Sequence, residues 1–411
     1  MKTYSISLTI AAATLLVAGS ASAQTGRYIG NLGIAEPTIA AGHAEGKMDN
    51  KPYSASYLPR VEGPLSKEHD TEIEDQIEHG FGDCDLVHQI VKDNAKKSAT
   101  GKFDTAATNA EGHNPNLTDE YNRDGVNPQA EGWEGFCHQW SPAGLDPSSA
   151  FIVSMDKIYA NVPFGIGDLR ELTTWTYQDS DAIFIGKRNN GDKKDSENLD
   201  PMDLLGTFQA FVGSGKPGVV LDIDPGTQVW NQPFYSYSTD TKELSGDDAK
   251  GGPRGAKHAY EVAMTATYAR EGQFAYRGDT YLQDLNWKFK VWTDKNGKVM
   301  KSAWEKDASD RIPDFAWVPN VKNHNENFKR LEKIAKEGVS VKDIQAFCEG
   351  MQKLTKDNYQ TEGKKLADIL NNICPVLDQN HLADYIAKTA ARTGIDASVL
   401  EGVIEGDGGN S

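Results

Sequence analysis

The stretch "GWEGFCHQW", Gly132 to Trp140, places one cysteine between two tryptophans after an approach that contains two glycines. If Cys137 begins a helix entered by Gly132 and Gly135, its thiol lies at the positive end of the helix dipole. Exposed backbone N–H groups at that end favour the thiolate, and they can also stabilise an oxyanion. The stretch therefore predicts a nucleophilic cysteine borne by a helix.

The chain has only three other cysteines, Cys84, Cys348 and Cys374. Cys348 and Cys374 both fall in a helical C-terminal stretch, and we expect them to pair with each other. Cys84 and Cys137 are then left over. The alternatives for Cys137 are therefore a disulfide to Cys84 or a buried core thiol.

Strand patterns follow this predicted helix. Residues 219–223 form an apolar run, residues 258–268 alternate between apolar and polar side chains, and residues 285–304 predict a hairpin around the turn "DKNG". A cysteine-bearing helix followed by antiparallel strands predicts an α+β fold.

A thiolate mechanism needs a base, and His138 does not face Cys137 if both lie on one helix. His258 opens the alternating strand, and we predict that it is the base. If residues 258–268 pair antiparallel with 285–293, Asp294 lies beside His258 and becomes the orienting carboxylate, with Asp284 as second choice. The alternatives are a surface histidine at a strand end and an ordinary turn aspartate.

Composition divides the chain into four parts. Residues 1–23 have the basic start, apolar run and small-residue cleavage site of a signal peptide. All eight tryptophans lie in 126–320, which is the expected catalytic core. Trp133, Trp140 and Trp230 are the candidate substrate contacts. The alternative is that these tryptophans pack in the core of the domain. Residues 24–125 are interpreted as an accessory or pro-region, and residues 321–411 as a helical domain.

Charge and hydropathy limit the partners. The formal charge of −17 argues against nucleic acid, because no basic stripe faces phosphates. After the signal peptide, no segment approaches the roughly 20 apolar residues of a membrane span. We expect a secreted protein that binds neither nucleic acid nor membrane.

Several segments resemble one family, the secreted transglutaminase elicitors of oomycetes and their marine Vibrio relatives. They are "GFCHQWSPA" around Cys137, "GVVLDIDPGTQVWNQP" (218–233), "HAYEV" from His258, and "PDFAWVP" (313–319). The stretch after "VWNQP" is "FYSYST", without the basic residues of the oomycete elicitor peptide, so elicitor activity is not expected.

The resemblance implies a papain-like core in which Cys137 attacks a protein glutamine and a lysine amine resolves the thioester. It also implies calcium, for which Asp192, Asp195, Glu197 and Asp200 supply oxygen atoms without EF-hand spacing. The alternatives are a papain-like protease or deamidase, in which water resolves the thioester, and a non-catalytic secreted effector with a Cys84–Cys137 disulfide.

Overall fold

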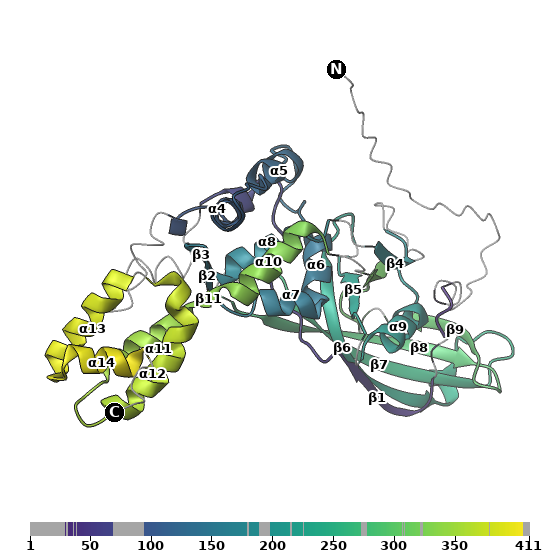
Figure 1. Cartoon of the computed structure of the whole chain (residues 1–411). Helices are drawn as coiled ribbons and strands as arrows, with labels where there is room; N and C mark the ends of the chain where they lie inside the picture. The colour runs from purple at the N-terminus through teal and green to yellow at the C-terminus, as the bar shows by residue number, and fades with distance from the viewer. Residues whose placement is uncertain are drawn as a thin grey trace, which may run out of the picture.

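Helices and one large antiparallel sheet make up the protein, as the computed structural model in Figure 1 shows. The predicted signal peptide lies outside the described residues. Within them, no helix combines the length and the apolar character needed to cross a membrane. The structure describes residues 29, 32–35, 37, 39–68, 94–178, 181–188, 198–213, 216–224, 226–272, 278–305, 307, 309–320, 324–377 and 379–405.

The large sheet has the strand order β4-β10-β5-β6-β7-β8-β9, and β1 pairs with the outer part of β6. Each of these strand pairs is antiparallel. The strands are β1 (Gly42–Lys47), β4 (Asp181–Gly186), β5 (Val219–Asp222), β6 (Asn231–Leu244), β7 (His258–Arg270), β8 (Tyr281–Thr293), β9 (Val299–Trp304) and β10 (Phe315–Asn320).

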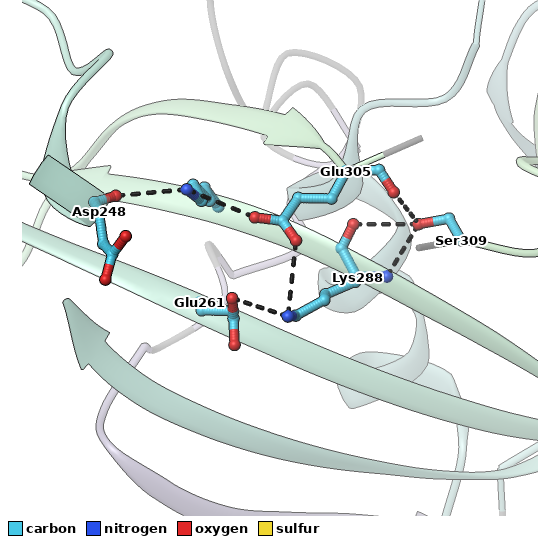
Figure 2. A network of polar contacts seen from close by, with 6 residues as sticks. Asp248, Glu261, Lys288, Glu305 and Ser309 are labelled. Carbon is cyan, nitrogen blue, oxygen red and sulfur yellow. Dashed lines mark hydrogen bonds and ion pairs between the residues drawn. The ribbon is translucent and has the colours of Figure 1, made fainter. Parts of the chain in front are cut away.

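Apolar and charged residues alternate along β7 and β8, so one face of these strands is buried and the other carries charged side chains. Val262 and Phe289 pair across the strands and are fully buried in the core. Between such positions lie the charged side chains of Figure 2, where the Lys288 ammonium is 2.8 Å from Glu261 and 3.6 Å from Glu305. The predicted hairpin over 285–304 and the predicted antiparallel pairing of 258–268 with 285–293 are both confirmed.

A layer of helices packs against the large sheet, mainly at β6. The helices of this layer share one core, which includes Phe103, Trp140, Leu169 and Phe328. Its helices are α4 (Ala99–Glu111), α5 (Leu117–Asp124), α6 (Cys137–Leu145), α7 (Pro147–Ile152), α8 (Ile166–Trp175) and α10 (Glu326–Glu337). Helix α9 (Pro201–Phe211) instead joins the core of the sheet. A small sheet and short helical turns complete this part: β2 (Lys157–Tyr159), β3 (Val162–Phe164), β11 (Val339–Ser340), η1 (Pro64–Ser66) and η3 (Gly246–Ala249).

The region before residue 126 contributes to this same core. Tyr53 and Phe103 belong to one buried cluster with Trp140 of the cysteine-bearing helix. The Lys102 ammonium of α4 lies 2.9 Å from Asp168 of α8, and both side chains are fully buried. A buried pair is costly unless its geometry is good, so it holds α4 and α8 in one arrangement. The predicted boundary at 125/126 therefore does not separate two cores.

The C-terminal helices form a second helical unit, which lies at the yellow end of Figure 1. The buried side chains of this unit form a separate core cluster. The predicted helical character of this region is confirmed. Its first helix, α10, packs in the middle core instead, through Phe328 and Leu331. The unit itself comprises α11 (Val341–Gln352), α12 (Tyr359–Ile373), η6 (Cys374–Val376), α13 (Gln379–Thr393) and α14 (Ala397–Ile404).

One expectation about the cysteines is wrong, and one alternative is excluded. Cys137 and Cys374 are free thiols, whereas Cys348 is disulfide-bonded. The Cys348–Cys374 pair is therefore absent although both residues lie in the same helical unit. A Cys84–Cys137 disulfide is likewise excluded, and Cys84 lies outside the described residues.

Candidate active site

Cys137 is the first residue of α6, and the chain reaches it through a close approach at Gly135. A Cβ atom at Gly135 would come within 2.5 Å of the Tyr57 carbonyl oxygen and would also overlap the Tyr57 ring. Only glycine fits at such a contact. The glycine before the cysteine therefore lets the segment around Tyr57 cover the start of the helix.

We expect Gly135→Ala to lower the free energy of unfolding by about 1–3 kcal/mol, because Tyr57 has to move for the added methyl group. Gly132→Ala is the matched control, since a Cβ atom there meets nothing within 4 Å. Thermal unfolding of both variants measures the difference. Equal melting temperatures would contradict the close-approach argument.

The Cys137 sulfur contacts the start of β6. Its thiol lies 3.5 Å from the Val229 carbonyl oxygen, and the Asn231 side-chain amide donates to the sulfur over 3.5 Å. The Trp317 indole N–H donates to the Asn231 side-chain oxygen over 2.8 Å, which fixes the amide orientation. Strand β6, which follows Val229 and Trp230, thus positions the Asn231 amide as a hydrogen-bond donor to the sulfur.

Asp222 lies directly across from Asn231 in the β5–β6 pair. The side chain is fully buried, and its Oδ1 accepts the backbone N–H groups of Trp230 and Asp224. Its Oδ2 is buried and makes no hydrogen bond to any described residue. Burial raises the pKa of this carboxyl to about 7. A buried carboxyl with an unused oxygen near a thiol is typical of a functional site.

The thiol itself is neutral in this structure. Burial raises the pKa of Cys137 to about 11, and the carboxylates of Asp222 and Glu271 add to the increase. The hydrogen bonds from Asn231 act in the opposite direction but do not outweigh burial. The expected thiolate at the helix N-terminus is therefore not favoured before substrate binds.

His258 and Asp294 lie far from Cys137. The His258 imidazole is 2.8 Å from Glu243, which follows Asn231 by twelve residues along β6. At about 3.3 Å per residue, His258 is about 40 Å along that strand from the thiol. Asp294 lies at the end that holds His258, as predicted, but its carboxylate accepts N–H groups of its own turn. The structure does not bring the Cys137–His258–Asp294 set together.

We expect His258→Ala and Asp294→Asn to leave catalytic rates within about twofold of wild type, because exposed groups so far away do not act on the reacting atoms. The comparison is the initial rate, at equal protein concentration, in the amine-incorporation assay that the family resemblance suggests. A loss of tenfold or more in either variant would show that His258 reaches the thiol in another conformation.

The three predicted tryptophans have different surroundings. Trp140 is fully buried and donates to the Tyr53 carbonyl, so it is a core residue. Trp133 is half-buried and donates to a nearby glutamate side chain. Trp230 contacts the Tyr57 ring and lines a pocket of 560 Å³ beside the site. Trp140 is therefore excluded as a substrate contact, whereas Trp230 lines a pocket and Trp133 stays a prediction.

Asp284, the second choice for the orienting carboxylate, lies at the other end of the β7–β8 pair. It is the register partner of Thr267, near the end of β7 that returns toward the site. It is therefore remote from His258 and does not orient that imidazole.

The structure offers no metal centre in the part that it describes. No group of three or more histidine, cysteine, aspartate or glutamate side chains there is arranged to hold an ion. Asp200 caps α9 and accepts the Ser302 hydroxyl. The other expected ligands, Asp192, Asp195 and Glu197, lie outside the described residues.

Asn231, Asp222 and Glu271 are site residues that the sequence patterns did not single out. Asn231 and Asp222 lie inside the stretch 218–233, where the family resemblance draws attention only to the elicitor-like segment. A signal is nevertheless present in this stretch. The segments "VVLD" and "NQPF" lie in neighbouring antiparallel strands, and their pairing sets Asp222 opposite Asn231.

Comparison with known proteins agrees with this architecture. The model of a family described as transglutaminase elicitor matches residues 91–353. A solved structure, that of the GP42 transglutaminase from Phytophthora sojae, is similar with a TM-score of 0.51 and 16% sequence identity. The similarity covers 72% of this chain and 93% of that one. Among curated proteins, none matches this sequence. The α+β fold with a cysteine-bearing helix beside an antiparallel sheet is therefore confirmed.

Proposed function

Because this chain belongs to the transglutaminase elicitor family, we propose that it is a secreted protein-glutamine γ-glutamyltransferase with Cys137 as nucleophile. One observation supports this most directly. The free Cys137 thiol lies at the start of α6, hydrogen-bonded by Asn231, with the buried Asp222 carboxyl opposite Asn231.

In the first half-reaction the thiol attacks the γ-carboxamide carbon of a protein glutamine. Asp222 receives the thiol proton and passes it to the departing nitrogen, which leaves as ammonia while the C–N bond breaks. Because the thiol is neutral in the free protein, this transfer accompanies attack instead of preceding it. The product is a thioester on Cys137.

The developing oxyanion needs donors that are already in place. The first N–H groups of α6, at Cys137 and His138, have no acceptor within the helix. The Asn231 amide, held by Trp317, is a further donor beside the sulfur. Such donors lower the barrier because they do not reorganise during the reaction.

In the second half-reaction a lysine amine attacks the thioester and forms an isopeptide bond. If water attacks instead, the product is a glutamate and the activity is a deamidase. Both use the same Cys137 thioester, so the preference between amine and water distinguishes them.

Calcium dependence is part of the proposal only through family membership. The described residues do not form an acidic cage for this ion, so no step of the mechanism depends on it. The assay is therefore run with calcium and with a chelator.

Incorporation of a fluorescent primary amine into casein tests the proposed function. We expect labelled casein and stoichiometric ammonia release. Ammonia without label would support the deamidase, and casein fragments without label would support a protease; either result would overturn the transferase assignment.

A further inference from the structure

A pocket of 560 Å³ lies at the end of the large sheet where β6 begins and β7 ends. Two of its lining residues, Trp230 and Gln232, flank Asn231, whose amide contacts the Cys137 sulfur. The lining is mainly polar, with Ile223, Trp230 and Leu285 among its apolar residues. A mainly polar pocket with a few apolar residues, next in the chain to the segment that contacts the nucleophile, fits a side chain with an apolar stem and a charged end.

Glu271 brings a carboxyl group to the thiol side of this pocket. Its backbone N–H donates to the Gln232 side-chain oxygen over 3.3 Å, which places Glu271 beside the start of β6. Burial raises the pKa of the Cys137 thiol and of the Tyr57 phenol, and the Glu271 charge adds to both increases. The carboxyl therefore lies within electrostatic range of the sulfur while it lines the pocket.

Two arginines and one further carboxylate complete the charged lining of the pocket. Burial raises the pKa of the Tyr268 phenol, and the positive charges of Arg311 and Arg270 oppose this increase, so both guanidinium groups lie near Tyr268. Burial likewise raises the pKa of Glu271 to about 7, although the charge of Arg270 opposes the increase. With Asp224 as the second carboxylate, the lining carries two carboxylates and two guanidinium groups. Its net charge therefore does not repel an incoming cation.

We infer that this pocket is the acyl-acceptor subsite and that Glu271 is the carboxylate that binds the lysine ammonium and receives its proton. The inference rests on the proposed transferase function and assigns residues to its second half-reaction. A lysine stem of four methylene groups lies against Trp230 and Leu285, and its nitrogen reaches the carboxyl beside the thioester.

The proton balance of this step is complete. The lysine enters as an ammonium and gives one proton to the Glu271 carboxylate as its nitrogen attacks the thioester carbon. The C–N bond forms and the C–S bond breaks, and the second nitrogen proton passes to the departing Cys137 sulfur. The products are an isopeptide, a neutral thiol and a protonated Glu271, which returns its proton to water.

The two carboxyl groups thus have separate roles. Asp222 is fully buried and is not among the residues that line the pocket. It can therefore exchange a proton with the thiol but cannot contact the acceptor amine. Glu271 is half-buried and lines the pocket, so it can meet the acceptor. Acylation and aminolysis are therefore separable by substitution.

The test compares Glu271→Gln with wild type in two assays on a glutamine peptide. Ammonia release in the first turnover without added amine reports acylation, and we expect it to fall by less than the transfer of amine falls. With increasing cadaverine, we expect the KM for the amine to rise at least about tenfold and the product to shift toward glutamate. Hydroxylamine, which is uncharged at neutral pH, should be used almost as well by the variant as by wild type.

Glu261→Gln is the matched control, because Glu261 lies on β7, the strand that ends just before Glu271, but belongs to the surface network of Figure 2. It should change neither assay. Equal losses of ammonia release and amine transfer in Glu271→Gln would overturn the subsite, as would an unchanged KM for cadaverine. If wild type releases no ammonia and transfers no amine, the proposed function falls and this inference falls with it.

Discussion

Cys137→Ala is expected to reduce amine incorporation by at least about 10³-fold, because no thioester can form without the sulfur. The substitution removes a small buried side chain at the start of α6 and leaves the hydrogen bond between Trp317 and Asn231 in place. The fold should therefore persist, which circular dichroism and the melting temperature check. Mass spectrometry of the protein incubated with a glutamine peptide should show the acyl adduct in wild type and none in the variant.

Cys374→Ala is the matched control, since Cys374 is a free thiol that is exposed in the C-terminal helical unit. It should retain full activity. Activity that survives in Cys137→Ala but is lost in Cys374→Ala would move the nucleophile out of the central body of the protein altogether.

Strand alternation is enough to predict the local structure around the site. The apolar positions of β7 and β8 predict both strands and their antiparallel register, and His258 does lie at the same end as Thr293 and Asp294. The prediction succeeds because a slip of one residue would turn the apolar side chains of a strand to the other face of the sheet. The glycine approach likewise predicts the helix that begins at Cys137.

Strand direction explains why His258 does not lie near the thiol. Strand β6 starts beside Cys137 and runs away from it for fourteen residues, and its antiparallel neighbour β7 runs back. The end of β7, not its start, therefore returns to the thiol. Glu271, which follows the last residue of β7, lies there, whereas His258 lies at the far end of the sheet.

The ionisation of the thiol does not follow from the helix position alone. A helix N-terminus favours the thiolate, but the opposing effect of burial depends on tertiary packing that the local sequence does not contain. The Tyr57 segment, which accepts the Phe136 N–H, and the start of β6 both pack against the first turn of α6. Burial by these segments determines the direction of the pKa change at Cys137.

Asp222→Asn is expected to lower the rate of thioester formation by about 10²–10⁴-fold, the usual contribution of a general base. Asparagine keeps an oxygen that can accept the Trp230 and Asp224 N–H groups, so the turn between β5 and β6 should be preserved. It cannot take the thiol proton. Since the pKa of Asp222 is raised to about 7, the wild-type rate should fall as pH decreases through that value and the carboxylate becomes protonated.

The rate of Asp222→Asn should not fall in this way as the pH decreases. If Asp222 had only a structural role, the variant would keep the same dependence on pH as wild type. Asp294→Asn makes the same chemical change in a remote turn and should match wild type at every pH. His138→Ala tests the neighbouring imidazole, whose ring lies 6.0 Å from that of Phe136. If His138→Ala loses the activity and Asp222→Asn keeps it, the base is the imidazole. The raised pKa of Asp222 would then reflect its burial and the neighbouring Asp314 and Asp224 carboxyl groups, without a catalytic role.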